Sequence, residues 1–353
     1  MGKNRNNKNK KNKNKNKKEL PFVSVCTPTF NRRPFIPFAI RCFMYQDYPR
    51  DKLEWIIIDD GTDKIEDLVK DVPNVKYFSY DKKMRLGKKR NLMHEKSSGD
   101  IIVYMDDDDY YPPNRVSHAV DMLTSNKTAL CAGSSVIHIF FKHDRKVWEF
   151  GPYGDKHATA GTFAFKRELL KITKYDENAS LAEEKDFLNG YTIPFVQLEP
   201  KKTILVFSHI HNTFDKRKLL TPKFRSNLVK QTDLTVDYFV KDPILKQFYM
   251  NDIDNLLSFY PEGNPNMKPD VIEQTKILEK KRDQMQKDAI MKQNRHMQDE
   301  KTPITVTTED GNTKELKMSE VLELIQNMQE ALKRKDKEIM NLKKQIEILS
   351  EEK

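Results

Sequence analysis

Between Phe22 and Met105, short apolar runs of strand length alternate with segments whose apolar residues recur at helical spacing. Strands that alternate with helices favour a parallel α/β sheet. Trp55–Ile58 is apolar at every position, as expected for a strand buried from both faces of such a sheet. The predicted strands are Phe22–Thr27, Leu53–Ile58, Val75–Tyr80 and Ile101–Met105, and the predicted helices cover residues 35–46, 64–71 and 87–96.

After Pro113 the alternation becomes looser. Here the pattern predicts a helix at Asn114–Thr124 with Asn114 as its cap, strands at 129–141, 146–150 and 203–207, a helix at 181–190, and helical structure over 218–260 interrupted near Pro243. A break at 261–265 precedes a polar helix at 271–300. Asp310-Gly311 is a turn signal, so a hairpin is expected over residues 303–317.

The last stretch of the chain carries a narrow apolar stripe with alternating spacings of three and four residues. Because a stripe of two positions in seven is too narrow for ordinary core packing, residues 318–349 are predicted to form a coiled coil through which the protein self-associates. A single amphipathic helix packed on the body is the alternative. The stripe consists of Met318, Val321, Ile325, Met328, Leu332, Lys335, Ile339, Leu342, Ile346 and Leu349, with Lys335 as its one break.

The positive charge of the chain is concentrated at one end. The 63 Lys and Arg exceed the 53 Asp and Glu by ten, but residues 1–18 hold nine basic residues and no acid, so the remainder is near neutral. A cationic fold that coats duplex DNA is therefore not expected. The tail contains no aromatic residue that could stack on single-stranded bases, so we predict no specific nucleic-acid binding. It could associate loosely with anionic surfaces or have no partner.

Location is suggested by what the sequence lacks. No run approaches the roughly 20 apolar residues that cross a bilayer, and the N-terminus has no apolar signal region. Cys26, Cys42 and Cys131 are widely spaced in apolar contexts, which predicts buried reduced thiols. We therefore expect a soluble, cytoplasmic protein.

Three predicted strands end in polar clusters, namely Pro28-Thr29-Phe30-Asn31, Asp59-Asp60-Gly61 and the four aspartates 106–109. Ligands of α/β sheets bind at this edge, the carboxyl ends of the strands. Four consecutive carboxylates repel one another unless a cation is present, and such oxygen ligands suit Mg²⁺ or Mn²⁺ together with substrate phosphates. A solvated acidic loop is the alternative.

The other two features at this edge suit a nucleotide. A carboxylate in Asp59-Asp60-Gly61 could accept hydrogen bonds from a base or a ribose, although the same residues could form a capping turn. Residues 87–91 begin a predicted helix with basic side chains, which favours a phosphate. A solvated basic helix start is the alternative.

In this order and spacing, four motifs resemble those of family 2 glycosyltransferases of the GT-A fold: Val23–Arg32, Ile56–Thr62, Gly87 with Arg90-Asn91, and Tyr104–Asp109 with Pro112. The resemblance covers about residues 21–215. It implies a nucleotide-diphospho-sugar transferase fold, Rossmann-like, with a mixed sheet flanked by helices. The implied activity is Mn²⁺- or Mg²⁺-dependent transfer of a sugar, with inversion, from a nucleotide sugar, a UDP-sugar being expected. The acceptor is not readable.

The resemblance also assigns roles by position. It places Thr29 and Asp60 at the base, with Asn31 and Asp59 as support, and Arg90 near the ribose or diphosphate. Asp108 would be the main metal ligand and Asp106 would face ribose and metal, while the role of Asp107 stays open. The expected donor-binding residues are Pro28, Thr29, Asn31, Asp59, Asp60, Gly87, Arg90, Asn91, Asp106 and Asp107.

A general base is expected at the start of a helix behind the acceptor pocket, where the family has an acidic pair. Glu184 matches that position, but the family usually has Asp there, so Glu183 and Asp186 also stay candidates. An exposed acidic helix start is the alternative.

A late histidine serves some family members as a further metal ligand. His211 followed by Asn212 looks most like that motif, and His209 would point to the same face if the segment were a strand. An ordinary core histidine or a phosphate contact is the alternative.

These expectations divide the chain into a Lys/Asn-rich tail (1–20), a GT-A catalytic domain (21–215), a helical extension (216–262), a linker with a polar helix (263–301) and a hairpin with the coiled coil (302–353). Two other functions are considered. A nucleotidyltransferase normally has a Gly-rich loop after its first strand, and Pro28–Arg33 contains no glycine. An inactive transferase-like scaffold is disfavoured by intact acidic residues at 106, 108 and 184.

Overall fold

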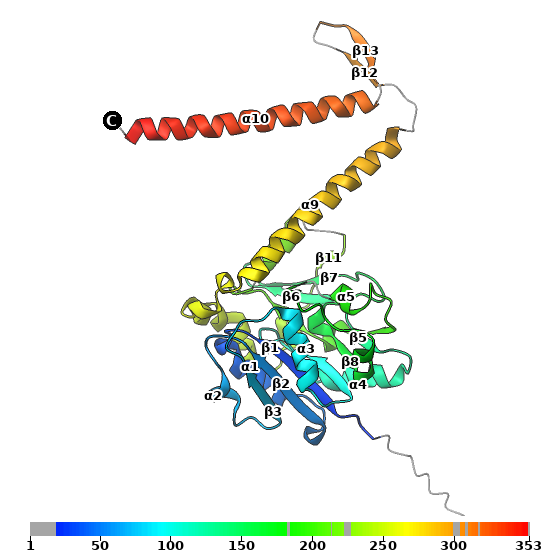
Figure 1. The fold of residues 1–353 in the computed structure, drawn as a ribbon, viewed down its shortest axis with the longest axis vertical. Coiled ribbons are helices and arrows are strands. Elements are labelled where there is room, and N and C mark those ends of the chain that lie inside the picture. Colours follow the sequence, from blue (N-terminus) through cyan, green and yellow to red (C-terminus); the bar gives the residue numbers. More distant parts are fainter. Residues whose placement is uncertain are drawn as a thin grey trace, which may run out of the picture. The chain divides into compact units, whose positions relative to one another are not determined.

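The computed structural model describes residues 19–181, 184–212, 214–221, 227–298, 304–307, 310–316 and 318–351. The chain forms two compact units, one that ends at Thr275 and one that begins at Lys276 (Figure 1). The first unit contains every residue of the predicted nucleotide site that the structure describes, and each unit is considered by itself below.

A seven-stranded mixed sheet runs through the first unit in the order β3-β2-β1-β4-β8-β5-β9. The first four of these strands are parallel, β8 is antiparallel to both β4 and β5, and β9 is parallel to β5. The mixed α/β sheet expected from the sequence is therefore confirmed. The strands are β1 (Val23–Thr29), β2 (Leu53–Asp59), β3 (Val75–Ser79), β4 (Ile101–Tyr104), β5 (Cys131–Gly133), β8 (Ala164–Lys166) and β9 (Phe195–Gln197).

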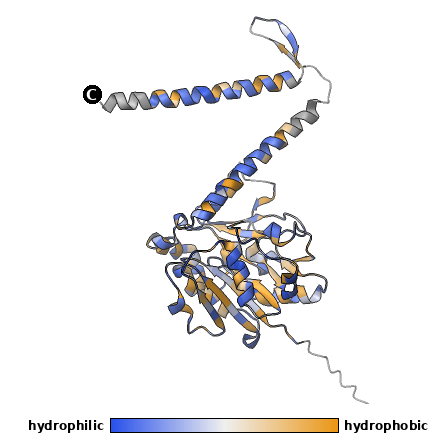
Figure 2. Cartoon of the chain, in the orientation of Figure 1, coloured by the Kyte–Doolittle hydropathy of each residue, from blue (hydrophilic) through white to orange (hydrophobic). Residues whose placement is uncertain are grey.

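Helices cover both faces of this sheet, because alternate residues of its strands enter two different cores. Val25 and Trp55 belong to a core that includes α1 and α4, whereas Cys26 and Ile56 belong to a second core with α3 and α5. Figure 2 shows the central strands as the most hydrophobic ribbons of this unit. The helices are α1 (Ile36–Met44), α2 (Glu66–Val69), α3 (Leu86–Lys96), α4 (Arg115–Ser125) and α5 (Glu184–Phe187).

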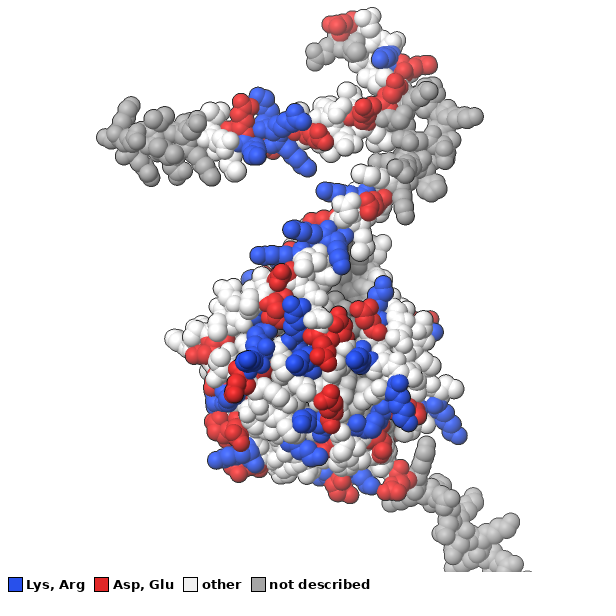
Figure 3. Space-filling view, in the orientation of Figure 1, with Lys and Arg blue, Asp and Glu red and all other residues white. Residues whose placement is uncertain are grey.

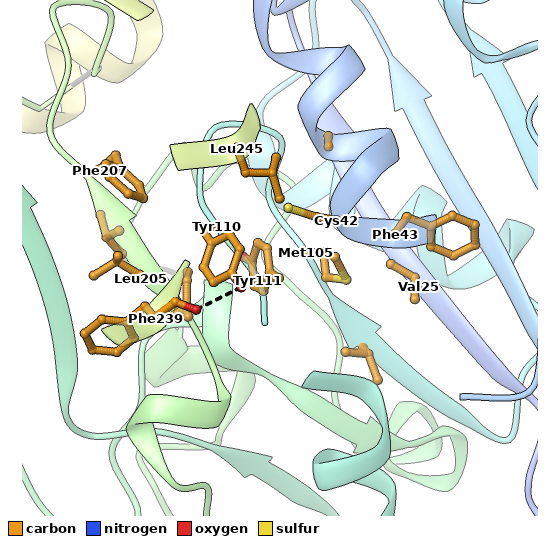
Figure 4. Packing of buried hydrophobic residues seen from close by; sticks show 14 of the residues in the cluster. Val25, Cys42, Phe43, Met105, Tyr110, Tyr111, Leu205, Phe207, Phe239 and Leu245 are labelled. Atoms are coloured by element: carbon orange, nitrogen blue, oxygen red, sulfur yellow. Dashed lines mark hydrogen bonds between the residues drawn. The ribbon is translucent and has the colours of Figure 1, made fainter. Parts of the chain in front are cut away.

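A second sheet, in the order β10-β6-β7-β11, packs on the first core. Tyr110 joins it to the loop after β4: its backbone pairs with Leu205, and its hydroxyl donates to the carbonyl oxygen of Phe239 at 3.1 Å (Figure 4). The elements are β6 (Ile137–Phe141), β7 (Lys146–Phe150), β10 (Leu205–Phe207), β11 (Val229–Gln231), α6 (Val236–Phe239), α7 (Pro243–Gln247), a π-helical turn (Phe248–Asp252) and α8 (Ile253–Ser258).

Three local predictions differ from the structure. The predicted strand over 129–141 is two strands in different sheets, β5 and β6. The predicted helix over 181–190 ends early, at Phe187 of α5, since Asn189 and Gly190 adopt positive φ angles of 47° and 64°. The helical prediction over 218–260 missed β11, which pairs with β7, because that pairing partner is distant in sequence. Short 3₁₀ turns cover Arg33–Phe35, Arg50–Lys52, Ala160–Thr162, Arg167–Lys171, Pro200–Lys202, Lys216–Leu220, Pro261–Gly263 and Pro265–Met267.

The C-terminal part is helical, with the predicted hairpin between two long helices. The hairpin strands β12 (Ile304–Thr307) and β13 (Thr313–Leu316) are antiparallel, and Gly311 has the positive φ of 77° that its turn requires. The helices are α9 (Pro269–Gln298), whose start belongs to the first unit, and α10 (Met318–Glu351), which covers the predicted stripe.

The three cysteines are buried and free, as predicted. Burial raises the pKa of the Cys42 thiol to about 12 and raises the pKa values of Cys26 and Cys131 still further, so the thiols stay protonated. No helix among the described residues is long and apolar enough to cross a membrane. On the face shown in Figure 3, acidic and basic side chains of the first unit are interspersed, as expected for a body of small net charge.

His94 makes the stability of the first unit depend on pH. Its Nε2 lies 2.5 Å from the Tyr104 hydroxyl, and burial lowers its pKa to about 3, against about 6.5 in an unfolded chain. The unfolded state therefore takes up this proton first as the pH falls, and stability present above pH 6.5 is lost toward pH 3. We expect His94 to contribute about 2 kcal/mol to the loss of unfolding free energy between pH 7 and 5.

Denaturant unfolding at pH 7 and at pH 5 measures this effect. His94→Gln should reduce the pH dependence, whatever it does to the absolute stability, and the exposed His143→Gln should leave the dependence unchanged. Equal pH dependence in the wild type and in His94→Gln would show that His94 is not the titrating group.

Candidate active site

The candidate site lies at the point where the strand order of the main sheet reverses. β2 and β3 follow on one side of β1, and β4 lies on its other side. Ligands of open α/β sheets bind outside the strand ends at such a switch point. Pro28 and the buried Thr29 end β1, and the acidic run follows β4, so the structure brings the predicted polar clusters to one edge of the sheet. The region between these strand ends is called the crevice below.

Asn31 supports the wall of this crevice. Its φ of 52° turns the chain sharply after β1. Its Oδ1 accepts hydrogen bonds from the backbone N–H groups of Thr62 and Asp63 at 2.7 and 3.1 Å, and its Nδ2 donates to the carbonyl oxygen of Glu262 at 2.8 Å. The amide is thus engaged with three loop positions, consistent with the supporting role expected of it.

Asp59 is also engaged within the protein. Its fully buried carboxylate accepts hydrogen bonds from the N–H groups of Gly61 and Ile65 and from the Tyr77 hydroxyl at 2.8, 3.2 and 2.7 Å. The pKa of the Tyr77 hydroxyl is raised, first by burial and second by its hydrogen bond to Asp59. Asp59 therefore holds the loop after β2 in shape.

Asp60 forms a buried ion pair with Lys89 of α3. The carboxylate also accepts from the N–H of Met84 at 2.5 Å, and the Lys89 ammonium donates to the carbonyl oxygen of Thr29 at 2.9 Å. Burial lowers the pKa of Lys89, while the charge of Asp60 opposes that shift. One lysine thus connects the ends of β1 and β2 with α3.

The first aspartate of the acidic run faces a short turn. Asp106 donates its N–H to the Tyr111 hydroxyl at 2.8 Å, and that hydroxyl donates to the carbonyl oxygen of Gly161 at 3.1 Å. A Cβ atom on Gly161 would lie 2.8 Å from Asp106 Oδ2. The Asp106 carboxylate therefore lies against the Ala160–Thr162 turn at a distance that only glycine permits.

The last aspartate belongs to the core. The Asp109 carboxyl accepts from the N–H of Phe207 at 3.1 Å, and its carbonyl oxygen accepts from the Tyr249 hydroxyl at 2.9 Å. Burial and the charge of Asp108 raise the pKa of Asp109 well above its usual range. Its role is to join the acidic run to the second sheet.

Between these two, Asp107 and Asp108 share Arg32. The Arg32 guanidinium lies 3.6 Å from Asp107 Oδ1 and 3.4 Å from Asp108 Oδ2. Burial and the charge of Asp108 raise the pKa of Asp107 to about 7. Burial acts in the same direction on Asp108, but the hydrogen bond with His209 and the charge of Arg32 outweigh it and hold the pKa well below its usual range. Asp108 is thus ionised at neutral pH.

The structure places His209, rather than His211, beside Asp108. His209 Nε2 lies 3.3 Å from Asp108 Oδ2, and burial lowers the His209 pKa to about 3, which keeps the ring neutral. Burial also lowers the His211 pKa to about 4, but its Nδ1 packs on Gly263, where a Cβ atom would lie only 2.7 Å away.

The two histidines do not lie in a strand, so the condition under which they would share a face is not met. The strand β10 ends at Phe207, and a turn follows in which the N–H of His211 donates to His209 Nδ1 at 3.2 Å. The local sequence contained no breaker between the histidines that would have indicated this turn.

Two side chains of the site have a spacing that suits a divalent cation. The described residues contain no group of three or more His, Cys, Asp or Glu that could hold a metal by themselves. Mg²⁺ and Mn²⁺ are usually bound by one or two protein ligands plus substrate phosphates. Two ligands at about 2.1 Å and at right angles lie about 3.0 Å apart. Asp108 Oδ2 and His209 Nε2 lie 3.3 Å apart, close to that spacing, and Nε2 also lies 2.7 Å from Asn212 Nδ2, which would have to move for the ring to bind a metal.

The residues predicted at the start of α3 mainly hold a neighbouring loop. Gly87 donates its N–H to the carbonyl oxygen of Ala179 at 2.9 Å, and a Cβ there would lie 1.9 Å from the Asp176 carbonyl oxygen. Asn91 exchanges two hydrogen bonds of 3.0 Å with the backbone of Tyr175. The Gly87 N–H is therefore engaged by the loop that contains Ala179, and it does not make the phosphate contact expected of this helix start.

Arg90 is buried in the same region. Its guanidinium lies 4.6 Å from the ring centre of Tyr104 and 5.7 Å from that of Tyr175. These cation–π contacts place its charge beneath the crevice, next to the end of β4.

Glu184 begins α5, and its Oε1 accepts from the N–H of Ala160 at 3.1 Å. Asp186 of the same helix is exposed, and Glu183 lies outside the described residues. The three-residue turn Ala160–Thr162 thus contacts Glu184 at its first residue and Asp106 at its second. The candidate base and the acidic run flank the same turn.

Arg115 of α4 fixes this turn from below. Its fully buried guanidinium donates to the carbonyl oxygens of Thr162, Phe163 and Tyr104 at 2.8, 2.9 and 3.4 Å. Burial lowers its pKa to about 10, so it stays charged at neutral pH. The guanidinium therefore ties the end of β4 to the turn between Asp106 and Glu184.

Sequence reasoning missed four cationic residues of the site: Arg32, Lys89, Arg115 and Lys268. Arg32 and Lys89 lie inside recognised motifs, but a single sequence does not tell a buried cation from an exposed one. Lys268 has no local signal. It lies far along the chain, yet its charge acts on Arg32 and on Asp107. Burial, and to a smaller extent the charge of Arg32, lowers the pKa of Lys268 to about 7.

Comparison with known proteins identifies the part of the chain that carries these motifs. Residues 24–179 match the family model described as glycosyl transferase family 2. A Haemophilus influenzae protein described as an uncharacterized glycosyltransferase is 26% identical over 120 residues, which are 33% of this chain and 47% of the relative. A Campylobacter jejuni GalNAc(5)-diNAcBac-PP-undecaprenol beta-1,3-glucosyltransferase is 35% identical over 98 residues, which are 26% of this chain and 30% of the relative.

The chain therefore spans less than half the length of these two curated relatives. Among solved structures, a mannosyltransferase from Pyrobaculum calidifontis, in complex with GDP-Man and Mn²⁺, aligns over 53% of this chain and 57% of its own with a TM-score of 0.44 and 20% sequence identity.

The buried pair of Asp60 and Lys89 gives a test of this geometry. Removing one partner of a buried ion pair leaves an uncompensated charge, so Lys89→Met should lower the unfolding free energy by about 3 kcal/mol. The adjacent Lys88 is exposed, and Lys88→Met removes the same charge with an expected effect of about 0.5 kcal/mol or less. Urea unfolding of the two variants measures the difference, and equal stabilities would contradict the pairing.

Proposed function

We propose that this protein is a glycosyltransferase that moves a sugar, with inversion, from a nucleotide-sugar donor bound in the crevice between β1 and β4. The observation that carries the proposal is the Ala160–Thr162 turn, which has Glu184 at one end and Asp106 next to it. A base for the acceptor and an acidic group for the donor thereby contact adjacent residues of one short turn. The match of residues 24–179 to the glycosyl transferase family 2 model supports the same activity.

Glu184 is proposed as the general base. In an inverting displacement the acceptor oxygen bonds to the anomeric carbon, while the bond from that carbon to the phosphate oxygen breaks. The acceptor proton then passes to a carboxylate. The contact of Glu184 with the Ala160 N–H orients one oxygen, which favours it over the exposed Asp186.

Asp108 and His209 would hold the divalent cation, Mn²⁺ or Mg²⁺, with Asp106 toward the ribose and the metal. When bound, such a cation stabilises the charge that develops on the departing diphosphate. Arg32 orients Asp108 from the other side. Asp60, fixed by Lys89, would accept hydrogen bonds from the base.

The finer parts of the proposal are expectations. A UDP-sugar is the expected donor, and the acceptor is a protein, glycan or lipid that the site does not specify. The free buried thiols suit a reducing compartment, so a cytoplasmic location belongs to the proposal. The division of the chain at residues 215 and 262 and the loose attraction of the basic tail to anionic surfaces also stay predictions.

Two variants separate donor binding from proton transfer. Asp108→Ala should lower the release of nucleoside diphosphate by about a hundredfold or more and weaken nucleotide binding. Glu184→Gln should keep nucleotide binding and lower release by roughly 10²–10⁴-fold, because only the base is lost. The measurement uses Mn²⁺ and a panel of nucleotide sugars, with diphosphate release and calorimetric binding of UDP and GDP as readouts.

The exposed Glu177→Gln is the control for charge removal near the site and should behave as the wild type. Pyrophosphate instead of nucleoside diphosphate as the product would indicate a nucleotidyltransferase. Absence of both products, with no binding of UDP or GDP, would indicate an inactive scaffold. Loss of activity in Asp186→Asn but not in Glu184→Gln would move the base to Asp186.

We also propose that α10 joins two or more copies of the chain. Its stripe residues Ile325, Met328, Leu332, Ile339 and Leu342 expose between 45% and 62% of their surface in the single chain. Figure 2 shows hydrophobic positions recurring along this helix. A stripe of this period is buried when a second such helix packs against it.

The double variant Ile325→Lys/Leu332→Lys should reduce the mass of the full chain, measured by light scattering, to that of a monomer, because charges at seam positions oppose pairing. The exposed polar positions Glu323 and Glu330 provide a matched control as Glu323→Lys/Glu330→Lys, which should keep the assembly. A monomeric wild-type protein, or an assembly that both double variants retain, would exclude the seam.

A further inference from the structure

A segment that lies beyond residues 24–179, the part that matches the family 2 model, crosses the candidate site. Residues 260–275, called the strap below, contain two 3₁₀ turns and the start of α9. On the side of β1 and β2, the Tyr260 hydroxyl donates to Asp63 Oδ2 at 2.8 Å, and the carbonyl oxygen of Glu262 accepts from Asn31 at 2.8 Å. The strap is therefore fastened to both loops that form the donor side of the crevice.

The other end of the strap reaches the loop before the candidate base. Asp270 pairs with Lys83 and accepts from the Ser180 hydroxyl at 2.8 Å, and Gln274 Oε1 accepts from the Ser180 N–H at 2.6 Å. Lys83 precedes Met84, whose N–H binds Asp60. Asp270 thus links the side of the crevice near Asp60, where the nucleobase is expected, to the loop that precedes Glu184.

The middle of the strap is in close contact with the site. A Cβ atom on Gly263 would lie 2.7 Å from His211 Nδ1 and 3.0 Å from the carbonyl oxygen of Asn31. Only a residue without a side chain allows the backbone to approach this closely. The strap is therefore seated against the same turn that carries His209.

Lys268 brings a positive charge from the strap into the crevice. Its Nζ lies 5.8 Å from the ring centre of Phe30, the residue that follows β1, and Lys83 and Lys89 lie 5.3 and 5.8 Å from the same ring. Lys83 and Lys89 are ion-paired with Asp270 and Asp60. The charges of Asp107 and Asp108 in the acidic run act on Lys268 and favour its charged form.

We propose that Lys268 binds the diphosphate of the nucleotide sugar and that the contacts of Asp270 position it; this inference rests on the proposed function. When the bond to the anomeric carbon breaks, its electron pair stays on the phosphate oxygen, and the diphosphate gains one negative charge. The acceptor proton goes to Glu184, so the new charge on the diphosphate is not neutralised by that proton. A lysine ammonium at this point offsets it, and ammonium groups are common phosphate ligands in proteins.

Isothermal titration of the full chain with UDP, UMP and uridine, each in the presence of Mn²⁺, tests the proposal, with GDP, GMP and guanosine as a second series. Lys268→Met should weaken diphosphate binding about tenfold or more and change nucleoside binding less than twofold. Lys268→Arg should restore most of the affinity. Asp270→Asn should weaken diphosphate binding in the same selective way, by a smaller factor.

Lys276→Met is the matched control, since Lys276 is an exposed lysine of the same helix. Equal diphosphate affinity in Lys268→Met and Lys276→Met would overturn the inference while leaving the proposed function intact. Equal loss for diphosphate and nucleoside would also overturn it, because Lys268 would then only support the fold. A wild-type protein that binds neither nucleoside diphosphate would overturn the proposed function and this inference with it. If Lys268→Met fails to fold, the affinities of Lys268→Arg and Asp270→Asn for nucleoside diphosphate and for nucleoside are compared in the same way. A selective loss of diphosphate affinity in Asp270→Asn, with little loss in Lys268→Arg, then supports the inference, and equal losses for both ligands overturn it.

Discussion

The crowding of carboxylates at one edge of the main sheet is the constraint on which the rest of the site depends. Asp106 to Asp109 follow the buried strand β4 after one residue, and Asp60 directly follows β2. Buried carboxylates are costly unless each has a cation or a hydrogen-bond donor. The fold supplies these partners from several distant segments: Arg32 after β1, Lys89 on α3, His209 after β10, and the strap.

The surrounding elements keep this arrangement in register. Arg115 ties the end of β4 to the Ala160–Thr162 turn, and Asp109 joins the acidic run to the second sheet. The turn can then hold Glu184 at Ala160 and Asp106 at Gly161. A rigid frame of this kind is what a displacement reaction needs, since donor and acceptor must be aligned before any bond changes.

The contrast between Asp107 and Asp108 follows from the same frame. Asp107 is buried and Asp108 is partly buried, and both face Arg32, yet only Asp108 is next to His209. One carboxyl therefore has a raised pKa and the other a lowered pKa, although the two residues are adjacent in the chain. The hydrogen bond with His209, which only Asp108 makes, is the contact that distinguishes the two carboxyls.

Local patterns in the sequence were enough to predict the strands β1 to β4 along the chain, the burial of Trp55–Ile58 and the polar clusters at three strand ends, because apolar periodicity and strand-end polarity are local properties. The folded chain was needed to find that His209 rather than His211 meets Asp108, that Lys89 pairs with Asp60, and that Lys268 enters the crevice. Each of these contacts joins segments that are distant in the chain. Their pairing depends on packing and on the compensation of buried charge, which no local pattern encodes.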